Sequence, residues 1–266
     1  MKIAVAQINS TENVPENLRK VQDGVRRASE EGAGLVVFPE ATMVAFGSPL
    51  YDVAVQHAET WKTEMQWLAA EQEITVVTGE FAPADDGKVR NVLAAYTPSG
   101  ERLDYAKIHL YDAFGFKESD DVAPGNDPLV INVDGVPVGL ALCYDIRFPK
   151  LFAEMSRKGA QVCLVAASWG AGPGKVEQWE TLARARALDS NTIVAAVDQA
   201  DPQVSGVQVS PKAPTGVGHS IVSDPFGHTI ASFGENEEMR VVDLDLDVVE
   251  KARTAIPVLE NARLGY

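Results

Sequence analysis

The chain has 266 residues, 45% of them hydrophobic, and a mean hydropathy of −0.07, which fit one large globular domain or two small ones. Its 38 acidic and 23 basic residues give a formal charge of −15. Such a surface repels phosphate backbones and anionic lipid, and we find no local basic patch, so we expect no nucleic-acid or membrane partner.

Strand and helix signals alternate along the chain, which opens with a strand at 2–7. Asn13 with Glu16 resembles the capping pair of a helix that carries Val21 and Val25 on one face and ends near Gly32. Further strands are expected at 35–38, 74–78, 92–96, 162–166, 192–197, 220–223, 229–233 and 239–244. Further helices are expected at 58–71, 150–158, 176–190 and 248–255.

No stretch of linker composition divides the chain. Each half begins strand, helix, strand, helix and then adds further strands, which indicates internal pseudo-symmetry. Several strands with helices on the outer faces predict one layered α/β domain over residues 1–266, with 257–266 as an extended C-terminal tail.

The sequence also carries signals about compartment and metal binding. The segment from Met1 to Gln7 lacks the apolar core of a signal peptide, and no apolar run approaches the roughly 20 residues that span a bilayer. Cys143 and Cys163 both lie in apolar strands, not in a disulfide framework, which favours a reducing, cytoplasmic setting. Histidines and carboxylates never gather at ligand spacing, so we expect no metal.

Segment 138–149 contains the first candidate site residue. Its apolar run ends abruptly at Cys143, and Pro149, which has no N–H to lose in the first turn of a helix, marks the start of the next helix. The thiol therefore lies at a strand-to-helix elbow, where it can project into a cleft. From this segment alone, a buried and inert cysteine is an equal alternative.

Three further polar residues interrupt apolar contexts at strand ends or in the loops beyond them: Glu40, Lys107 and Glu118. Singly, Glu40 and Lys107 would form a structural ion pair, and Glu118 would be an exposed loop acid. Together with Cys143 they supply a nucleophile, a carboxylate to take its proton and a cation to hold an oxyanion, as nucleophilic acyl transfer requires. His109 is an alternative base, because it alternates with Lys107 along an extended segment and would share its face.

Three blocks resemble the signatures of the nitrilase superfamily of carbon–nitrogen hydrolases: Phe-Pro-Glu at 38–40, Lys-Ile-His-Leu at 107–110 and Cys-Tyr-Asp-Ile-Arg-Phe-Pro at 143–149. The resemblance covers nearly the entire chain and continues through 179–186, 218–220 and 222–227. The 143–149 block and the helix around Trp179 are most similar to the amidase branches that contain ω-amidases and deaminated glutathione amidases.

This resemblance implies a catalytic triad of Glu40, Lys107 and Cys143, with Glu118 as the family's second, loop-borne acid and His109 as a structural residue. It implies a four-layer α-β-β-α sandwich that pairs with a second copy into a homodimer. It also implies a mechanism through a cysteine thioester that requires no cofactor. Cys163 lies in mid-strand among apolar residues, so we expect it to be an inert core residue.

The same resemblance suggests which residues bind substrate. The Tyr144 N–H would hold the oxyanion with Lys107, and Trp169 would either wall the pocket or pack in the core. Arg147 is expected to bind substrate, and together with Asp145 it would shape the elbow and would not react.

The leading function is hydrolysis of a small amide, such as the ω-amide of a keto or dicarboxylic acid, to a carboxylate and ammonia. An N-carbamoyl amide or a nitrile would use the same triad, and a catalytically silent interaction protein is a third alternative. Segments 45–49, 167–170 and 201–215 depart from the family pattern and leave the particular substrate open.

Overall fold

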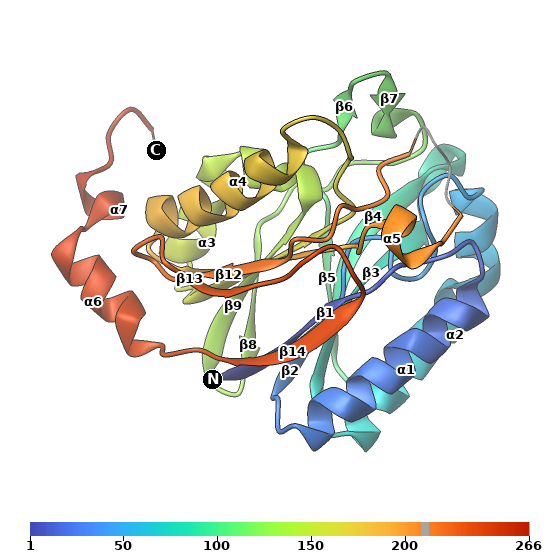
Figure 1. Ribbon diagram of the computed structural model, residues 1–266, viewed down its shortest axis with the longest axis horizontal. Helices are drawn as coiled ribbons and strands as arrows, with labels where there is room; N and C mark the ends of the chain where they lie inside the picture. Colours follow the sequence, from blue (N-terminus) through green and yellow to red (C-terminus); the bar gives the residue numbers. More distant parts are fainter. Residues whose placement is uncertain (209–212, 266) are drawn as a thin grey trace.

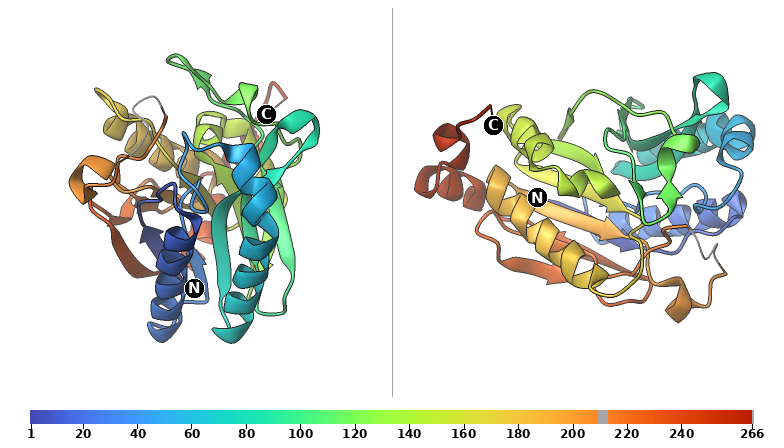
Figure 2. Two further views of the ribbon diagram at one scale, coloured as in Figure 1. Left: turned by 90° about the vertical axis from the view of Figure 1, so that its right-hand side faces the viewer. Right: turned by 90° about the horizontal axis from the view of Figure 1, so that it is seen from above.

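The computed structural model describes residues 1–208 and 213–265 and shows two β-sheets that lie face to face, with helices on their outer sides (Figure 1, Figure 2). This arrangement is the four-layer α-β-β-α sandwich expected from the sequence. Residues 209–212 of the 201–215 segment lie outside the described residues. Within the described ranges, no helix is long and apolar enough to cross a membrane.

The first sheet is built mainly from the N-terminal half of the chain. Its three central strands are parallel, and antiparallel strands flank them on both sides. In sheet order the strands are β14 (Glu238–Asp243), β1 (Lys2–Gln7), β2 (Leu35–Val37), β3 (Thr75–Pro83), β4 (Val89–Tyr96) and β5 (Arg102–Ala106).

The second sheet repeats this plan with strands from the C-terminal half. Its parallel centre is again flanked by antiparallel strands, which confirms the predicted pseudo-symmetry. In sheet order the strands are β13 (Thr229–Ser232), β12 (Ile221–Ser223), β11 (Ile193–Asp198), β10 (Val162–Ala167), β9 (Val136–Leu142) and β8 (Leu129–Val133).

Two pairs of helices form the outer layers. The first sheet is covered by α1 (Val14–Glu30) and α2 (Leu50–Glu71), and the second by α3 (Pro149–Arg157) and α4 (Lys175–Ser190) (Figure 1). Smaller elements are the hairpin of β6 (Asp112–Ala113) and β7 (Phe116–Lys117), the single turn α5 (Pro202–Ser205), and the C-terminal helices α6 (Asp247–Ala255) and α7 (Val258–Asn261).

The alternation of side chains along β1 shows how the layers are filled. Ile3 and Val5 point to the core between the two sheets, whereas Ala4 and Ala6 point to the core beneath α1 and α2. Both faces are apolar because both are covered, as expected for the parallel centre of an α/β sheet.

Several elements differ from the sequence prediction. Helix α2 begins at Leu50 and not at residue 58, because Leu50 and Ala54 are buried and extend its apolar face. Strand β3 continues to Pro83 because it pairs with β4 from Val76 to Pro83. The sequence patterns predict neither β8 nor the β6–β7 hairpin. The 257–266 segment contains α7, which follows Pro257, so it is not extended throughout.

Candidate active site

Cys143 lies at the carboxyl end of β9, in the helical turn at 143–147 that leads into α3. Its φ is +43°, a left-handed conformation that costs a non-glycine residue about 1–2 kcal/mol. The Asp145 carboxylate holds this turn by accepting hydrogen bonds from the Leu142 N–H at 2.9 Å and the Tyr105 hydroxyl at 2.7 Å. The predicted elbow is therefore present, and buried polar contacts support its strained backbone.

Glu40 is fully buried in the loop that follows β2. This loop crosses β3 so closely that a Cβ on Gly79 would lie 2.5 Å from the Pro39 oxygen, so that position requires glycine. Oε2 of Glu40 accepts the Ser168 N–H at 2.9 Å, and its backbone oxygen accepts Nε2 of Gln199 at 2.9 Å. These contacts fix both the carboxylate and the loop that carries it.

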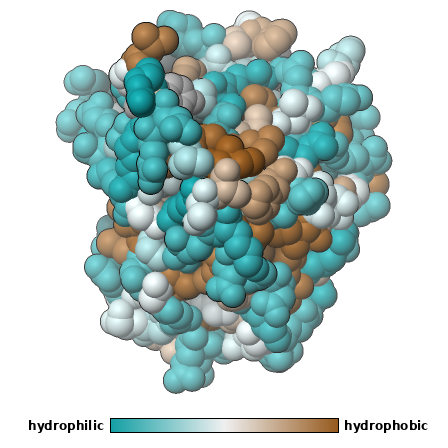
Figure 3. Space-filling model, turned by 90° about the vertical axis from the view of Figure 1, so that its left-hand side faces the viewer, coloured by the Kyte–Doolittle hydropathy of each residue, from teal (hydrophilic) through white to brown (hydrophobic). Residues whose placement is uncertain are grey.

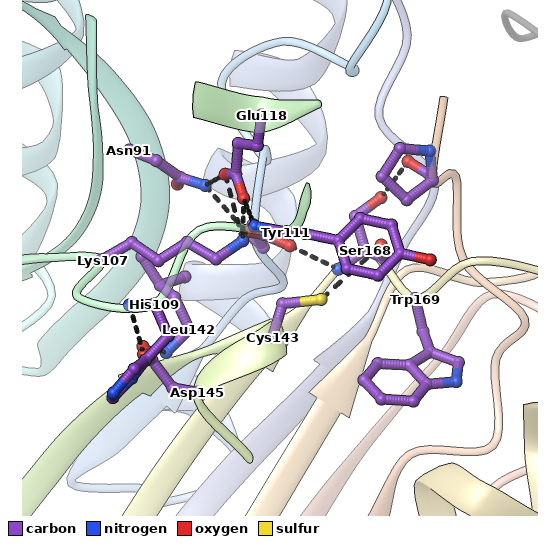
Figure 4. A network of polar contacts seen from close by, with 12 residues as sticks. Asn91, Lys107, His109, Tyr111, Glu118, Leu142, Cys143, Asp145, Ser168 and Trp169 are labelled. Atoms are coloured by element: carbon purple, nitrogen blue, oxygen red, sulfur yellow. Dashed lines mark hydrogen bonds and ion pairs between the residues drawn. The ribbon is translucent and has the colours of Figure 1, made fainter. Parts of the chain in front are cut away.

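Lys107 joins two buried carboxylates just beyond β5. Its Nζ lies 2.8 Å from Oε1 of Glu40 and 2.9 Å from Oε2 of Glu118. Asn91 on β4 donates from Nδ2 to Glu40 at 2.7 Å and to Glu118 at 3.0 Å, and Glu118 also accepts the Tyr111 N–H at 2.7 Å. Figure 4 shows Asn91, Lys107 and Glu118 converging beside Cys143.

Burial sets the protonation states of this cluster. It raises the pKa of Glu40, although the charge of Lys107 opposes the rise. It would lower the pKa of Lys107, but the charges of Glu118 and Glu40 outweigh it and raise that pKa well above its ordinary value. Burial, followed by the charge of Glu40, raises the pKa of the Cys143 thiol well above its ordinary value. The thiol is therefore protonated at neutral pH and needs a base to become a nucleophile.

One pocket, open at its mouth, contains the cluster. The Cys143 sulfur points toward Ser168, whose backbone oxygen lies 3.9 Å away (Figure 4). The lining includes every site residue that the sequence predicts: Glu40, Lys107, Glu118, Cys143, Tyr144, Arg147 and Trp169. The pocket is also lined by Phe46, Tyr111, Phe116, Ser168, Gly170, Lys175 and Pro214.

Two cations face the pocket around Trp169. The Arg147 guanidinium lies 5.1 Å from the centre of the Trp169 ring, and Nη2 of Arg147 donates to Gln178 at 2.7 Å. The Lys175 ammonium lies 4.1 Å from the ring centre of Phe114, which stands at the tip of the β6–β7 hairpin. Neither cation forms an ion pair with a carboxylate in residues 1–208 and 213–265. Burial, together with the charge of Arg147, lowers the pKa of Lys175.

His109 does not share a face with Lys107, so that sequence expectation is wrong. The strand β5 ends at Ala106, and the alternation of side chains ends with it. The His109 Nδ1 lies 2.7 Å from Oδ1 of Asp145, and its ring stacks on Phe148 with 3.7 Å between the centres. The imidazole thus supports the elbow from outside the pocket.

Cys163 is fully buried in the middle of β10 and does not line the pocket. Burial raises the pKa of its thiol to about 12. In the described part of the chain, no cluster of three or more histidines, cysteines or carboxylates could hold a metal ion.

Asn91 and Lys175 are among the site residues that the sequence did not predict. Asn91 could have been noticed as a polar residue inside the apolar strand β4, where a buried amide needs partners. Lys175 carries no such signal, because its position at the pocket depends on the Gly-rich loop before α4 and on the hairpin that carries Phe114.

Comparisons with known proteins agree with this geometry. Residues 2–254 match the carbon-nitrogen hydrolase family. The chain is 52% identical to Hydrolase Rv0480c of Mycobacterium tuberculosis strain H37Rv over 98% of this chain and 95% of that protein. It is 31% identical to the omega-amidase NIT2 of Xenopus tropicalis over 93% of this chain and 90% of that protein.

A solved structure is similar as well. An amidase from Nesterenkonia sp. AN1, determined after Michael addition of acrylamide at its active-site cysteine, is 25% identical and superposes with a TM-score of 0.81. The match covers 97% of this chain and 98% of that one.

Proposed function

Because the chain belongs to the carbon–nitrogen hydrolase family, we propose that it hydrolyses a small amide to a carboxylate and ammonia through a thioester on Cys143. The observation that carries this proposal is the position of a protonated, buried thiol in one pocket with the buried carboxylate of Glu40. A carboxylate whose pKa is raised by burial is well suited to accept and return a proton near neutral pH.

In the first half of the reaction, Glu40 takes the thiol proton while Sγ of Cys143 bonds to the amide carbon. Lys107 and the Tyr144 N–H hold the oxyanion, each donor contributing about 3 kcal/mol of transition-state stabilisation by analogy with other acyl-transfer enzymes. The C–N bond then breaks, and Glu40 gives its proton to the departing nitrogen, which leaves as ammonia.

In the second half, Glu40 takes a proton from water, and the hydroxide bonds to the thioester carbon. The C–S bond breaks and the proton returns to sulfur, so Glu40 and Cys143 regain their starting states. Glu118 contributes by fixing Lys107 through the 2.9 Å ion pair and by holding the Tyr111 N–H. Without it, Lys107 would keep one carboxylate partner and more freedom to move.

Arg147 and Lys175 favour an amide whose far end is a carboxylate. Both face the pocket without a carboxylate partner among the described residues, in a protein of net charge −15. Uncompensated cations at the mouth of a largely apolar pocket would attract an anion and select it over a neutral molecule. Together with the likeness to an omega-amidase, this charge supports a monoamide of a short dicarboxylic acid as the substrate.

The experiment is a screen for ammonia release at neutral pH. The wild type and Cys143→Ala are compared on four compounds: succinamate, butyramide, which has a similar length but no charge, butyronitrile and an N-carbamoyl amino acid. We expect the wild type to release much more ammonia from succinamate than from butyramide, and we expect Cys143→Ala to release none. Preferential turnover of the nitrile or the N-carbamoyl compound would replace the amidase proposal with the corresponding alternative. No release from any compound would favour the silent interaction protein.

We further propose that the protein is a cytoplasmic homodimer that pairs through α3 and α4. Both cysteines are free, as suits a reducing compartment. Ile108, Phe148 and Leu151 line an apolar groove beside α3. Figure 3 shows further apolar side chains gathered on the face that carries α6 and α7, where Ile256 is half exposed. Exposed apolar surface of this kind is typical of an interface between protein chains.

A further inference from the structure

Asp198 is a fully buried carboxylate at the carboxyl end of β11 that has no role in the reaction described above. Its Oδ1 accepts the Trp169 N–H at 2.8 Å, and its Oδ2 accepts the Val217 N–H at 2.8 Å. Among the residues that the structure describes, no lysine, arginine or histidine forms an ion pair with it. Burial raises the pKa of this carboxyl well above its ordinary value, and the hydrogen bonds from the Val217 and Trp169 N–H groups oppose the rise.

Burying a charge without a counter-charge lowers the stability of the fold. We therefore expect the two segments that these hydrogen bonds hold in place to be important for function. Trp169 follows β10 and Val217 follows the 213–216 segment, and the two segments form one wall of the pocket. Two more bonds cross between them: Gly216 N–H to the Trp169 oxygen at 3.0 Å, and Ser168 Oγ to the Pro214 oxygen at 2.8 Å. Asp198 is the group that fastens both segments to the sheet.

The residue next to Trp169 connects this wall to the proposed base. The Ser168 N–H donates to Oε2 of Glu40 at 2.9 Å, so a shift of Trp169 would displace the donor that orients this carboxylate. Figure 4 shows Ser168 and Trp169 on the side of the site where the Cys143 sulfur points. When Asp198 is ionised, its charge also raises the pKa of the Cys143 thiol, and the charge of Glu40 raises the pKa of Asp198.

We propose that Asp198 is a positioning residue of the amide hydrolysis, which fixes the Trp169 and 214–217 wall and thereby directs the Ser168 N–H at Glu40. The proposal rests on the proposed function for its effect on turnover. The titratable groups that interact with Asp198 are Glu40 beyond β2 and Cys143 beyond β9, and Lys107 beyond β5 and Glu118 beyond β7 act on the same thiol. Removing the negative charge of Asp198 makes ionisation of the thiol easier.

The test compares Asp198→Asn with Cys163→Ala, a core change outside the pocket that also removes the second thiol. Three quantities are measured: the melting temperature, the pH dependence of Cys143 alkylation by iodoacetamide, and kcat/KM for succinamate against pH. In Asp198→Asn we expect the midpoint of Cys143 alkylation to move to lower pH by about half a unit or more, because the charge of Asp198 raises the pKa of that thiol. We expect kcat/KM to fall by roughly 10- to 100-fold, because one N–H loses its acceptor. In Cys163→Ala only the melting temperature should change.

An unchanged alkylation midpoint in Asp198→Asn would overturn the proposal. So would a loss of activity that is no larger than the loss in Cys163→Ala when both variants show the same fall in melting temperature. If Asp198→Asn does not fold, Asp198→Ser is measured in its place, because its hydroxyl and an admitted water can accept the same two N–H groups without the charge. The alkylation profile needs no amide. If the wild type releases no ammonia but the alkylation profile shifts in Asp198→Asn, the proposed function is refuted and the electrostatic role of Asp198 is retained.

Discussion

Replacing Glu40 by Gln tests the assignment of the base most directly, because the change keeps the size of the side chain and removes the proton acceptor. The carboxylate accepts three hydrogen bonds, from Lys107 and Asn91 on Oε1 and from the Ser168 N–H on Oε2. A glutamine has one acceptor oxygen, so in either orientation its NH₂ group faces at least one of these donors.

The cost to folding should be moderate. Leaving a buried donor without an acceptor costs about 1–3 kcal/mol, whereas removing a buried charge gives part of this back. Lys107 also keeps the second carboxylate, Glu118. The loss of turnover should be larger, because positioned proton transfer contributes about 10²- to 10⁴-fold to the rate. Among the described residues, the only other carboxylate that lines the pocket is Glu118, and it already accepts hydrogen bonds from Lys107 and the Tyr111 N–H.

The assay is ammonia release from succinamate at saturating concentration, with circular dichroism to confirm folding. Glu80→Gln is the matched control, because Glu80 is a buried carboxylate paired with Arg102 outside the pocket, and it should retain turnover. His109→Asn should lose stability or some rate but keep measurable hydrolysis. Near-normal rates in Glu40→Gln, with a folded and inactive His109→Asn, would mean a Cys–His dyad and would refute the reasoning.

Four further predictions follow from the geometry. Iodoacetamide should modify Cys143 much faster than Cys163, whose buried thiol has its pKa raised to about 12, and should abolish turnover; peptide mapping checks which thiol reacts first. The acid limb of kcat/KM should have its midpoint above the ordinary carboxylate value of 4.5, because the pKa of Glu40 is raised and activity grows as it loses its proton. Lys175→Met should raise KM for succinamate by roughly 10-fold and leave KM for butyramide unchanged, which steady-state kinetics would show. Light scattering at micromolar concentration should give a dimer, and Leu188→Asp on the exposed face of α4 should shift it toward monomer.

The sequence predicted much of the site because its residues leave a recognisable pattern. Glu40, Lys107 and Cys143 each interrupt or end an apolar run. Glu40 follows β2 and Lys107 follows β5 of the first sheet, Cys143 ends β9 of the second, and the packing of the two sheets brings these strand ends together in one pocket. Asp198 carries the same signal, since it ends the apolar strand β11, and it was overlooked because the family's motif blocks do not include it. Asp198 could therefore have been recognised from the sequence as a charged residue at the end of an apolar strand.

Other features depend on contacts that no local pattern encodes. The position of Lys175 follows from a hairpin about 60 residues away in the chain, and the rotation of His109 toward Asp145 follows from where β5 stops pairing with β4. The start of α2 is set by the burial of Leu50 and Ala54 against the first sheet, although the intervening polar residues hide its period.

The charges of the buried cluster explain why a raised pKa of Glu40 suits the proposed chemistry. With a protonated thiol, Glu40 and Glu118 already place two negative charges around the single cation Lys107. An oxyanion formed while Glu40 remained ionised would add a third negative charge in a medium that screens poorly. Moving the thiol proton to Glu40 removes one charge as the oxyanion gains one, so the charge of the pocket stays constant through the attack. A carboxylate already inclined by burial to hold a proton makes that exchange less costly, and Lys107, released from part of its pairing with Glu40, becomes free to stabilise the new anion.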